Sequence, residues 1–351
     1  MKHTITSIDR IVLAHGGGGR ETWSLVEELI VSKVPRELRS VLNGIGIDVL
    51  DDGAAIRVGN KYIVFSVDSY TVNPIFFPGG NIGTLAVSGT INDLLMMGAK
   101  PVAVMDSIVV EEGFPIDKLN TIIESMTKLL VSEGIALIGG DFKVMPKGQV
   151  DKIIIGMMGI GIAEKLIVDS NLKIGDKIIV TGPIGDHGTI ILASQLGYLD
   201  KISGLKSDSK PLTKIMLPLI EEYGDYIHAA RDPTRGGLAS VLAEWAKQTN
   251  TTIIVDRNSI PVRSQVRGFL EALGIDPIHM ACEGVAVLSV SPQVADEVIG
   301  FLREKGEQHA CIVGEVVKPK SDIVRGRVLV RTEIGGLTIV EPQALPIPRI
   351  C

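Results

Sequence analysis

The sequence predicts an α+β protein of about two domains. Its 351 residues are more than twice the roughly 150 residues of an average domain. Apolar residues make up 45% of the chain, which is enough to form sizeable cores. Pairs of short strand-like segments are followed by helices, without the regular strand–helix–strand alternation of a doubly wound sheet. This order favours an α+β fold.

The composition excludes several classes of protein. Charged residues make up 22% of the chain and the net charge is −6, so we expect neither disorder nor the basic surface that binds nucleic acid. The longest apolar segment, 153–163, contains three glycines and is too short to cross a bilayer. The N-terminus has no signal-peptide pattern, and the three cysteines form no disulfide framework. We therefore expect a cytoplasmic protein without a membrane partner.

In the first half of the chain, helix signals are mixed with strand signals. The clearest helix begins at Asn81, a favoured N-cap residue, and ends at Gly98, with Pro101 just beyond. Gly83 and Gly89 inside it cost roughly 1 kcal/mol each relative to alanine, so we expect close packing against them. Two further helices are predicted at 23–34 and 117–133, and strands at 55–58, 61–67, 135–138 and 152–162.

The second half predicts a second α+β unit that begins near Gly175. The polar segment 203–210 is expected to be a surface loop, and the proline-rich end from Glu341 to Cys351 an extended tail. Strands are predicted at 177–181, 252–255, 284–290, 310–316 and 327–330, and helices up to about 196 and at 215–223, 237–247 and 262–273. We divide the chain into a glycine-rich segment (1–36), two domains (37–165 and 166–338) and a tail (339–351).

Acidic residues beside turns and strand ends are the candidate site of the first domain. Asp51 and Asp52 precede a glycine, Asp93 follows an asparagine in the helix that begins at residue 81, and Asp68 and Asp141 end strand-like runs. Each one could instead be a turn residue or a helix cap. Carboxylates that converge on one cleft need a cation between them, and Mg²⁺ prefers oxygen ligands together with substrate phosphates.

Phosphate binding would also need positive charge and open backbone amides. Lys143 lies two residues after Asp141 and could contact a phosphate oxygen or be an ordinary surface lysine. The glycine run 16–19 and the pair Gly79-Gly80, which leads into a helix, could supply backbone N–H donors. Neither matches a known nucleotide-binding fingerprint in its required context. These residues indicate a nucleotide site of an unfamiliar type.

Four residues of the second half are also candidates. Asp232 precedes a predicted helix and is either its N-cap or a site residue. Glu283, at the start of an apolar strand, is either a solvated strand end or a base that points into a cleft. His187 is either a helix-start residue or a polar site group. Cys351 stands at the end of the proline-rich stretch, where it is either an exposed carrier thiol or a terminal residue without a role.

Seven segments together point to a known family: LAHGGGGR (13–20), SVDS (66–69), FPGGNIGTLAVSGTINDLLMMGAKP (77–101), GGDFKV (139–144), GPIGDHG (182–188), DPTRGGLA (232–239) and PRIC (348–351). With these segments the chain resembles the HypE family of carbamoyl dehydratases, which act in the maturation of nickel–iron hydrogenases. That family is related to aminoimidazole ribonucleotide synthetase, selenophosphate synthetase and thiamine-phosphate kinase. The resemblance implies a two-domain architecture similar to that synthetase (PurM-like), a homodimer with a shared β-barrel, and a mobile tail.

The resemblance also implies a reaction. HypF would load a carbamoyl group onto Cys351, ATP would phosphorylate the carboxamide oxygen, and loss of phosphate would leave a thiocyanate. The cyano group would then pass to iron held by HypC–HypD. The resemblance implies Asp68, Asp93 and Asp141 at the Mg²⁺ of ATP, Lys143 at a phosphate and Glu283 as the base. The resemblance also implies that five further residues bind ATP. They are Asp51, Asp52, Gly79 and Gly80 in domain 37–165, and Asp232 in domain 166–338.

Two other functions remain open from the sequence. One is a different ATP-dependent enzyme of this superfamily, similar to selenophosphate synthetase or thiamine-phosphate kinase. Those enzymes lack a terminal PRIC, and the first normally carries a cysteine or selenocysteine beside a lysine in its N-terminal segment, which this chain does not. The other is a nucleotide-binding scaffold that docks maturation partners without catalysis.

Overall fold

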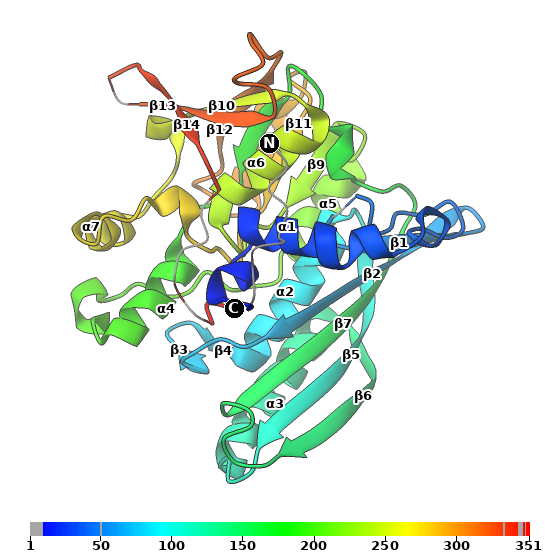
Figure 1. Cartoon of the computed structure of the whole chain (residues 1–351), viewed down its shortest axis with the longest axis vertical. Helices are drawn as coiled ribbons and strands as arrows, with labels where there is room; N and C mark the ends of the chain where they lie inside the picture. Colours follow the sequence, from blue (N-terminus) through cyan, green and yellow to red (C-terminus); the bar gives the residue numbers. More distant parts are fainter. Residues whose placement is uncertain (1–9, 50, 333, 343–346, 348) are drawn as a thin grey trace.

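Two large β-sheets, the helices that cover them and a small two-stranded sheet make up the described part of the protein (Figure 1). The computed structural model describes residues 10–49, 51–332, 334–342, 347 and 349–351. The first sheet has five strands in the order β1-β2-β7-β5-β6, and the second has seven in the order β14-β13-β10-β12-β8-β11-β9. No helix in these ranges is both long and apolar enough to cross a membrane. The mixture of the two sheets with helices confirms the predicted α+β class.

The first sheet is antiparallel except for one pair of neighbouring strands, β5 and β6, which run parallel. Helix α3 connects these two strands in the chain. The predicted strand 135–138 is too short, because β6 continues through the glycines that follow it. β5 is not predicted from the sequence at all. The strands are β1 (Ala54–Val58), β2 (Lys61–Tyr70), β5 (Lys100–Glu111), β6 (Ala136–Met145) and β7 (Ile153–Ala163), and a small hairpin is formed by β3 (Phe76–Phe77) and β4 (Gly80–Asn81).

Helix α2 (Ile82–Met96) is the buried centre of the first unit, where it packs on the sheet together with α3 (Ile116–Glu133). The predicted N-cap is confirmed, because the side chain of Asn81 accepts hydrogen bonds from the backbone of Gly83 and Thr84. The expected close packing is also confirmed. A β-carbon on Gly83 would lie 2.6 Å from Cγ of Met126, and one on Gly89 2.5 Å from the Tyr70 hydroxyl. Almost every α2 residue is buried, so polar residues on this helix project into the interior.

The opposite face of the first sheet is not covered by the described part of the chain. β7 shows this most clearly, since its odd-numbered residues are buried and its even-numbered residues are partly or fully exposed. Apolar side chains line the uncovered face, among them Val67, which is 73% exposed, Ile162 at 41% and Met105 at 37%. Val67 and Met105 both align with Met158 across the sheet. An apolar sheet face of this kind is normally packed against another layer.

The second sheet has helices on both faces. α6 packs on one face with the buried Trp245, and α5 and α8 pack on the other. The predicted helices 215–223, 237–247 and 262–273 are confirmed within a few residues, whereas β9, β14 and α8 are not predicted. The strands are β8 (Lys177–Val180), β9 (Ile227–Arg231), β10 (Thr252–Asp256), β11 (Val287–Val290), β12 (Cys311–Val317), β13 (Arg327–Arg331) and β14 (Leu337–Val340). The helices are α4 (Asp186–Leu196), α5 (Thr213–Tyr223), α6 (Gly237–Thr249), α7 (Ser264–Ala272) and α8 (Ala295–Glu304).

Three segments outside the sheets shape the space between the two units. Helix α1 (Arg20–Leu29) is shorter than the predicted 23–34 and continues in short 3₁₀ turns. The segment 203–210 is a loop, as predicted, but part of it is buried and does not lie on the surface. Leu205 is buried, and the backbone N–H of Ser207 donates to the carbonyl of Pro78 at 2.8 Å. The described tail residues 349–351 lie against residues 71–73, which follow β2.

Candidate functional site

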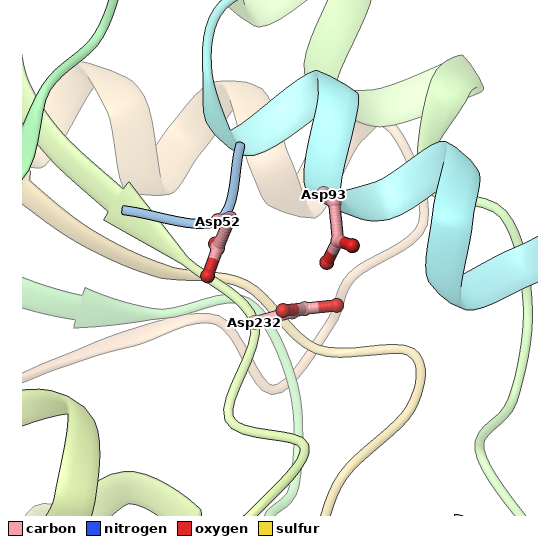
Figure 2. Close-up of side chains that lie close together, drawn as sticks. All are labelled: Asp52, Asp93 and Asp232. Carbon is pink, nitrogen blue, oxygen red and sulfur yellow. The ribbon is translucent and has the colours of Figure 1, made fainter. Parts of the chain in front are cut away.

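Three carboxylates from distant parts of the chain meet at one point, as Figure 2 shows. Asp52 lies just before β1, Asp93 projects from α2, and Asp232 follows β9 directly. Each offers an oxygen, and these oxygens all lie within 4.8 Å of one another. We call these three residues the carboxylate trio. It joins the first unit, which supplies Asp52 and Asp93, to the second, which supplies Asp232.

Burial makes the trio unfavourable without a counterion. Burial, followed by the charge of Asp68, raises the pKa of Asp232 to about 7. Burial and the neighbouring carboxylates also raise the pKa of Asp93 and of Asp52 well above the usual range. Oδ2 of Asp52 and Oδ2 of Asp232 are buried without a hydrogen-bond partner in the described structure. Unpartnered carboxylate oxygens that converge in this way fit a hard divalent cation such as Mg²⁺.

Arg231 neutralises the acidic groups on one side of the trio. This buried guanidinium lies 2.8 Å from Oδ1 of Asp52, 2.8 Å from Oδ2 of Asp169 and 2.5 Å from Oε2 of Glu244. Asp51 is more distant from it, at 3.9 Å, and instead accepts the backbone N–H of Asp169 at 3.0 Å. Arg231 therefore pairs with Oδ1 of Asp52, while Oδ2 of Asp52 has no hydrogen-bond partner in the described structure.

Acidic residues, Glu283 among them, also lie near the thiol of Cys351. Glu283 is 1% exposed, and its Oε1 has no partner among the described residues. Burial first, then the charges of Asp232, Asp208 and Asp68, raises the pKa of Glu283 well above the usual range. Burial and the charge of Glu283 raise the pKa of the Cys351 thiol to about 12, and Arg235 opposes this. The structure thus brings the predicted base, which is buried, near the predicted carrier thiol of the partly buried Cys351.

Arg235 interacts by charge both with the thiol of Cys351 and with an acidic residue of the first sheet. Its guanidinium lies 3.8 Å from Oδ1 of Asp68, which is on β2. Ser66, two residues earlier on the same strand, hydrogen-bonds to Asp93 of the trio. Arg231 and Arg235 were not predicted as site residues from the sequence. The available signal was their position beside the predicted Asp232, at the edge of and within the segment DPTRGGLA (232–239).

A cleft of about 550 Å³ opens next to the trio. This volume lies within the range of about 300–1,000 Å³ typical of small-molecule sites. The ammonium of Lys247 lies 5.5 Å from the centre of the Trp23 ring at its rim. Asp52, Asp232 and Arg235 supply charged groups to its wall. The cleft therefore combines an apolar, aromatic wall with the acidic groups that could hold a metal-bound phosphate.

The predicted glycine segments lie in two different places. Gly18, with a φ of +76°, packs so closely on Arg235 that an added β-carbon would lie 2.4 Å from its Cβ, and it lines the cleft. Gly79 instead packs against the carbonyl of Ser207, and Gly80 against Thr84. The run 16–19 is thus the glycine segment that borders the cleft.

Asp141 and Lys143 are not brought to the trio within this chain. Both lie on β6 and are exposed, and they form an ion pair with each other. The Lys143 ammonium lowers the pKa of Asp141. Three strand spacings separate β6 from the Asp68 strand β2, which amounts to about 14 Å. Asp141 also aligns with Ser107, Gly156 and Ser69 on the uncovered face, whereas Asp68 faces the other way.

Known proteins match this chain over nearly its whole length. The N-terminal and C-terminal domain families of AIR synthase related proteins match residues 50–163 and 173–327. Carbamoyl dehydratase HypE of Rhizobium leguminosarum bv. viciae is 36% identical over 97% of this chain and 95% of its own. A crystal structure of hydrogenase maturation protein HypE in complex with ATP aligns with a TM-score of 0.80 and 36% identity over 97% of this chain and all of that one. A HypE–HypF complex aligns with a TM-score of 0.82 and 34% identity, covering 91% of this chain and 99% of that one.

Proposed function

Because the chain belongs to the HypE family of carbamoyl dehydratases, we propose that it converts a carbamoyl group on Cys351 into a thiocyanate at the expense of ATP. In this role it would supply the cyanide ligands of a nickel–iron hydrogenase. The observation that carries the proposal is the position of Cys351. The charges of Glu283, of Arg235 and of Asp232 from the carboxylate trio all act on its partly buried thiol, which therefore lies near the predicted base and the trio.

ATP would bind in the cleft with its phosphates toward the trio. Asp52, Asp93 and Asp232 are the residues that would hold Mg²⁺, since two of them have buried oxygens without partners. When bound, the ion neutralises phosphate charge and orients the γ-phosphoryl group for transfer. Asp68 would support this site through Arg235, and Asp51 through its hydrogen bond to the Asp169 backbone. This assignment keeps Asp93 from the set implied by the family resemblance and adds Asp52 and Asp232.

The chemistry follows from the poor leaving ability of a carboxamide oxygen. Transfer of the γ-phosphoryl group to that oxygen forms an O–P bond and releases ADP. The nitrogen would lose one proton to solvent when its carboxamide oxygen is phosphorylated. Glu283 would take the second nitrogen proton, the C–O bond would break, and phosphate would leave as the C≡N bond forms. Burial makes the Glu283 carboxylate a stronger base, because it raises its pKa. Overall, S-carbamoyl cysteine and ATP give S-cyano cysteine, ADP and phosphate.

We also propose that the protein acts as a homodimer. The uncovered apolar face of the first sheet carries Val67, Met105 and Ile162, and a second copy packed there would bury it. Asp141 and Lys143 lie on this same face. A dimer with a shared barrel would therefore allow them to approach an ATP site built partly by the partner subunit, as the family resemblance implies.

The tail would serve more than one enzyme. Cys351 must accept its carbamoyl group from HypF and later give up the cyano group to iron on the HypC–HypD complex. A thiol fixed beside Glu283 cannot reach both HypF and the HypC–HypD complex, so we expect the tail 339–351 to leave this position and return to it. From Glu341 the tail spans about ten residues, or roughly 30 Å at 3.1 Å per residue. The thiol must also stay reduced, which fits the cytoplasm.

Intact-mass measurement tests the function directly. After incubation with HypF, carbamoyl phosphate and ATP, the expected adduct is the carbamoyl group minus one water, on one thiol. Without ATP the adduct should stop at the carbamoyl group, and Cys351→Ala should acquire neither. A protein that binds ATP but never loses water from its carbamoyl adduct would contradict the proposal and favour a scaffold role.

A further inference from the structure

His187 is a buried histidine with both ring nitrogens engaged. It lies in the first turn of α4, is fully buried, and stands edge-on to the ring of Phe77 at 5.4 Å. Its Nδ1 is 2.8 Å from the hydroxyl of Ser207, and its Nε2 is 2.7 Å from the backbone carbonyl of Ile350. The second contact joins α4 to the residue just before Cys351.

The directions of these hydrogen bonds are fixed by the chemistry of the partners. A carbonyl oxygen can only accept, so Nε2 of His187 must carry the proton that it donates to Ile350. In a neutral ring Nδ1 is then an acceptor, and the Ser207 hydroxyl donates a hydrogen bond to it. The oxygen of Ser207 in turn accepts the backbone N–H of Ser209 at 3.1 Å. Burial lowers the pKa of His187 to about 4, which keeps the ring neutral at physiological pH.

The loop that contains Ser207 also contacts the backbone of Glu283, the proposed base. One oxygen of Asp208 accepts the backbone N–H of His187 at 3.0 Å. Its other oxygen accepts the backbone N–H groups of Glu283 and Gly284, each at 3.1 Å. The segment 207–209 therefore links the tail contact to the backbone of the proposed base. A shift of this loop would move His187 and Glu283 together.

The other hydrogen bonds of the tail are made to the first unit, and some of them use side chains. The Thr71 hydroxyl donates to the carbonyl of Cys351 at 3.1 Å, and the Arg349 guanidinium donates to the carbonyl of Thr71 and pairs with Asp151. The N–H of Thr71 donates to the carbonyl of Cys351 at 3.0 Å, and the N–H of Asn73 donates to the carbonyl of Arg349 at 3.0 Å. Ile350 is turned the other way, with its carbonyl toward His187. Among the described residues, His187 is thus the side chain that fixes the middle of the docked segment 349–351 from the second unit.

We propose that His187, held in the Nε2-protonated form by Ser207, is the positioning residue that docks the tail and sets Cys351 beside Glu283. This inference rests on the proposed function for its purpose, because it assumes that the docked thiol is the reacting one. The contact is made to the backbone, so it does not depend on whether the thiol is free, carbamoylated or cyanated. Docking by a few hydrogen bonds also allows the tail to leave again.

Alkylation of Cys351 by iodoacetamide, read on the peptide that contains it, measures docking without ATP or any partner. His187→Met removes the donor and keeps a side chain of similar length, and should raise the labelling rate roughly three- to tenfold, as expected for one lost buried hydrogen bond. His187→Gln places an amide N–H near the position of Nε2 and should stay within about twofold of wild type. Ser207→Ala should give an intermediate increase, and the exposed His309→Met should give none.

Equal labelling in wild type and His187→Met would overturn the proposal, and so would equal increases in the Met and Gln variants. If His187→Met does not fold, the ranking of Ser207→Ala above wild type and His187→Gln decides instead. Failure of the wild type to form a cyano adduct would contradict the proposed function and leave the labelling result standing. With the adduct formed, His187→Met should slow dehydration but bind ATP normally, and His187→Gln should restore the rate.

Discussion

Replacement of Asp232 by asparagine is the most informative perturbation of the carboxylate trio. The wild-type carboxyl has a pKa of about 7 in the folded protein, raised by burial and by Asp68 from a usual value of 3.8. In the unfolded chain this carboxyl ionises near its usual pKa, whereas in the folded protein it keeps its proton up to about pH 7. Raising the pH from about 4 to about 7 therefore favours the unfolded state and lowers the stability of the metal-free protein. The difference of about 3 pKa units corresponds to about 4 kcal/mol. This cost is absent below about pH 4 and complete above about pH 7.

Asp232→Asn should remove that cost and one metal ligand at the same time. In the metal-free protein at about pH 8, we expect the variant to be more stable than wild type, by up to about 4 kcal/mol. Mg²⁺ with ATP at one hundred times the Kd should stabilise wild type by about 2.7 kcal/mol. The same ligand concentration should stabilise the variant far less, because one of three converging carboxylates is missing.

Urea unfolding at about pH 5 and about pH 8, with and without Mg²⁺–ATP, measures both effects. Asp200→Asn is a matched control, since this exposed aspartate forms an ion pair with Lys201 alone, at 3.3 Å, within the part of the chain that the structure describes. The control should follow wild type at both pH values. If Asp232→Asn shows the wild-type pH slope and the wild-type response to Mg²⁺–ATP, the trio is not a metal site and the electrostatic reasoning fails.

Three further perturbations have distinct expected outcomes. Glu283→Gln should bind ATP and accept the carbamoyl group but keep it, and a cyano adduct in the intact mass would remove Glu283 as the base. Arg231→Met removes the positive partner of the buried Asp169 and of the partly buried Asp52 and Glu244. It should lower the free energy of unfolding by about 3–5 kcal/mol, whereas a change below about 1 kcal/mol in urea would show that other groups neutralise them. Val67→Asp places a charge on the uncovered sheet face, where light scattering should find a monomer that remains folded, and an unchanged dimer would place the interface elsewhere.

Local signals predicted much of the fold. The helix from Asn81 was predictable because its cap and its terminating glycine lie in the sequence next to the residues they affect. β6 was cut short because Gly139 and Gly140 end its apolar run, although Gly140 packs against Asp106 of the neighbouring strand. That contact depends on a residue 34 positions earlier in the chain. Sequence pattern alone carries no such information.

The candidate site shows the same division. Asp52, Asp93 and Asp232 were each predictable as acidic residues at an ATP site, through the family resemblance. Their mutual distance was not, because Asp232 is supplied by a different unit. Asp141 looked equivalent to Asp68, since both end apolar runs. In the sheet they face opposite sides and lie three strands apart, which only the strand order reveals.

The role of His187 was left open by the sequence for a physical reason as well. A histidine at a helix start gives no sign of which tautomer it adopts. The tautomer follows from the two partners, Ser207 and the Ile350 carbonyl, and both are brought close only by the fold. Electrostatic partners far apart in the chain are therefore what the structure adds.

The most direct test of the central claim follows one oxygen atom. If ATP phosphorylates the carboxamide oxygen of the group on Cys351, that oxygen must leave as part of inorganic phosphate. Carbamoyl groups made with a heavy oxygen isotope should therefore transfer the label to phosphate, one label for each cyano adduct formed. Mass analysis of the released phosphate reports it. Label that appears in water instead, while the cyano adduct accumulates, would contradict dehydration through a phosphorylated carboxamide.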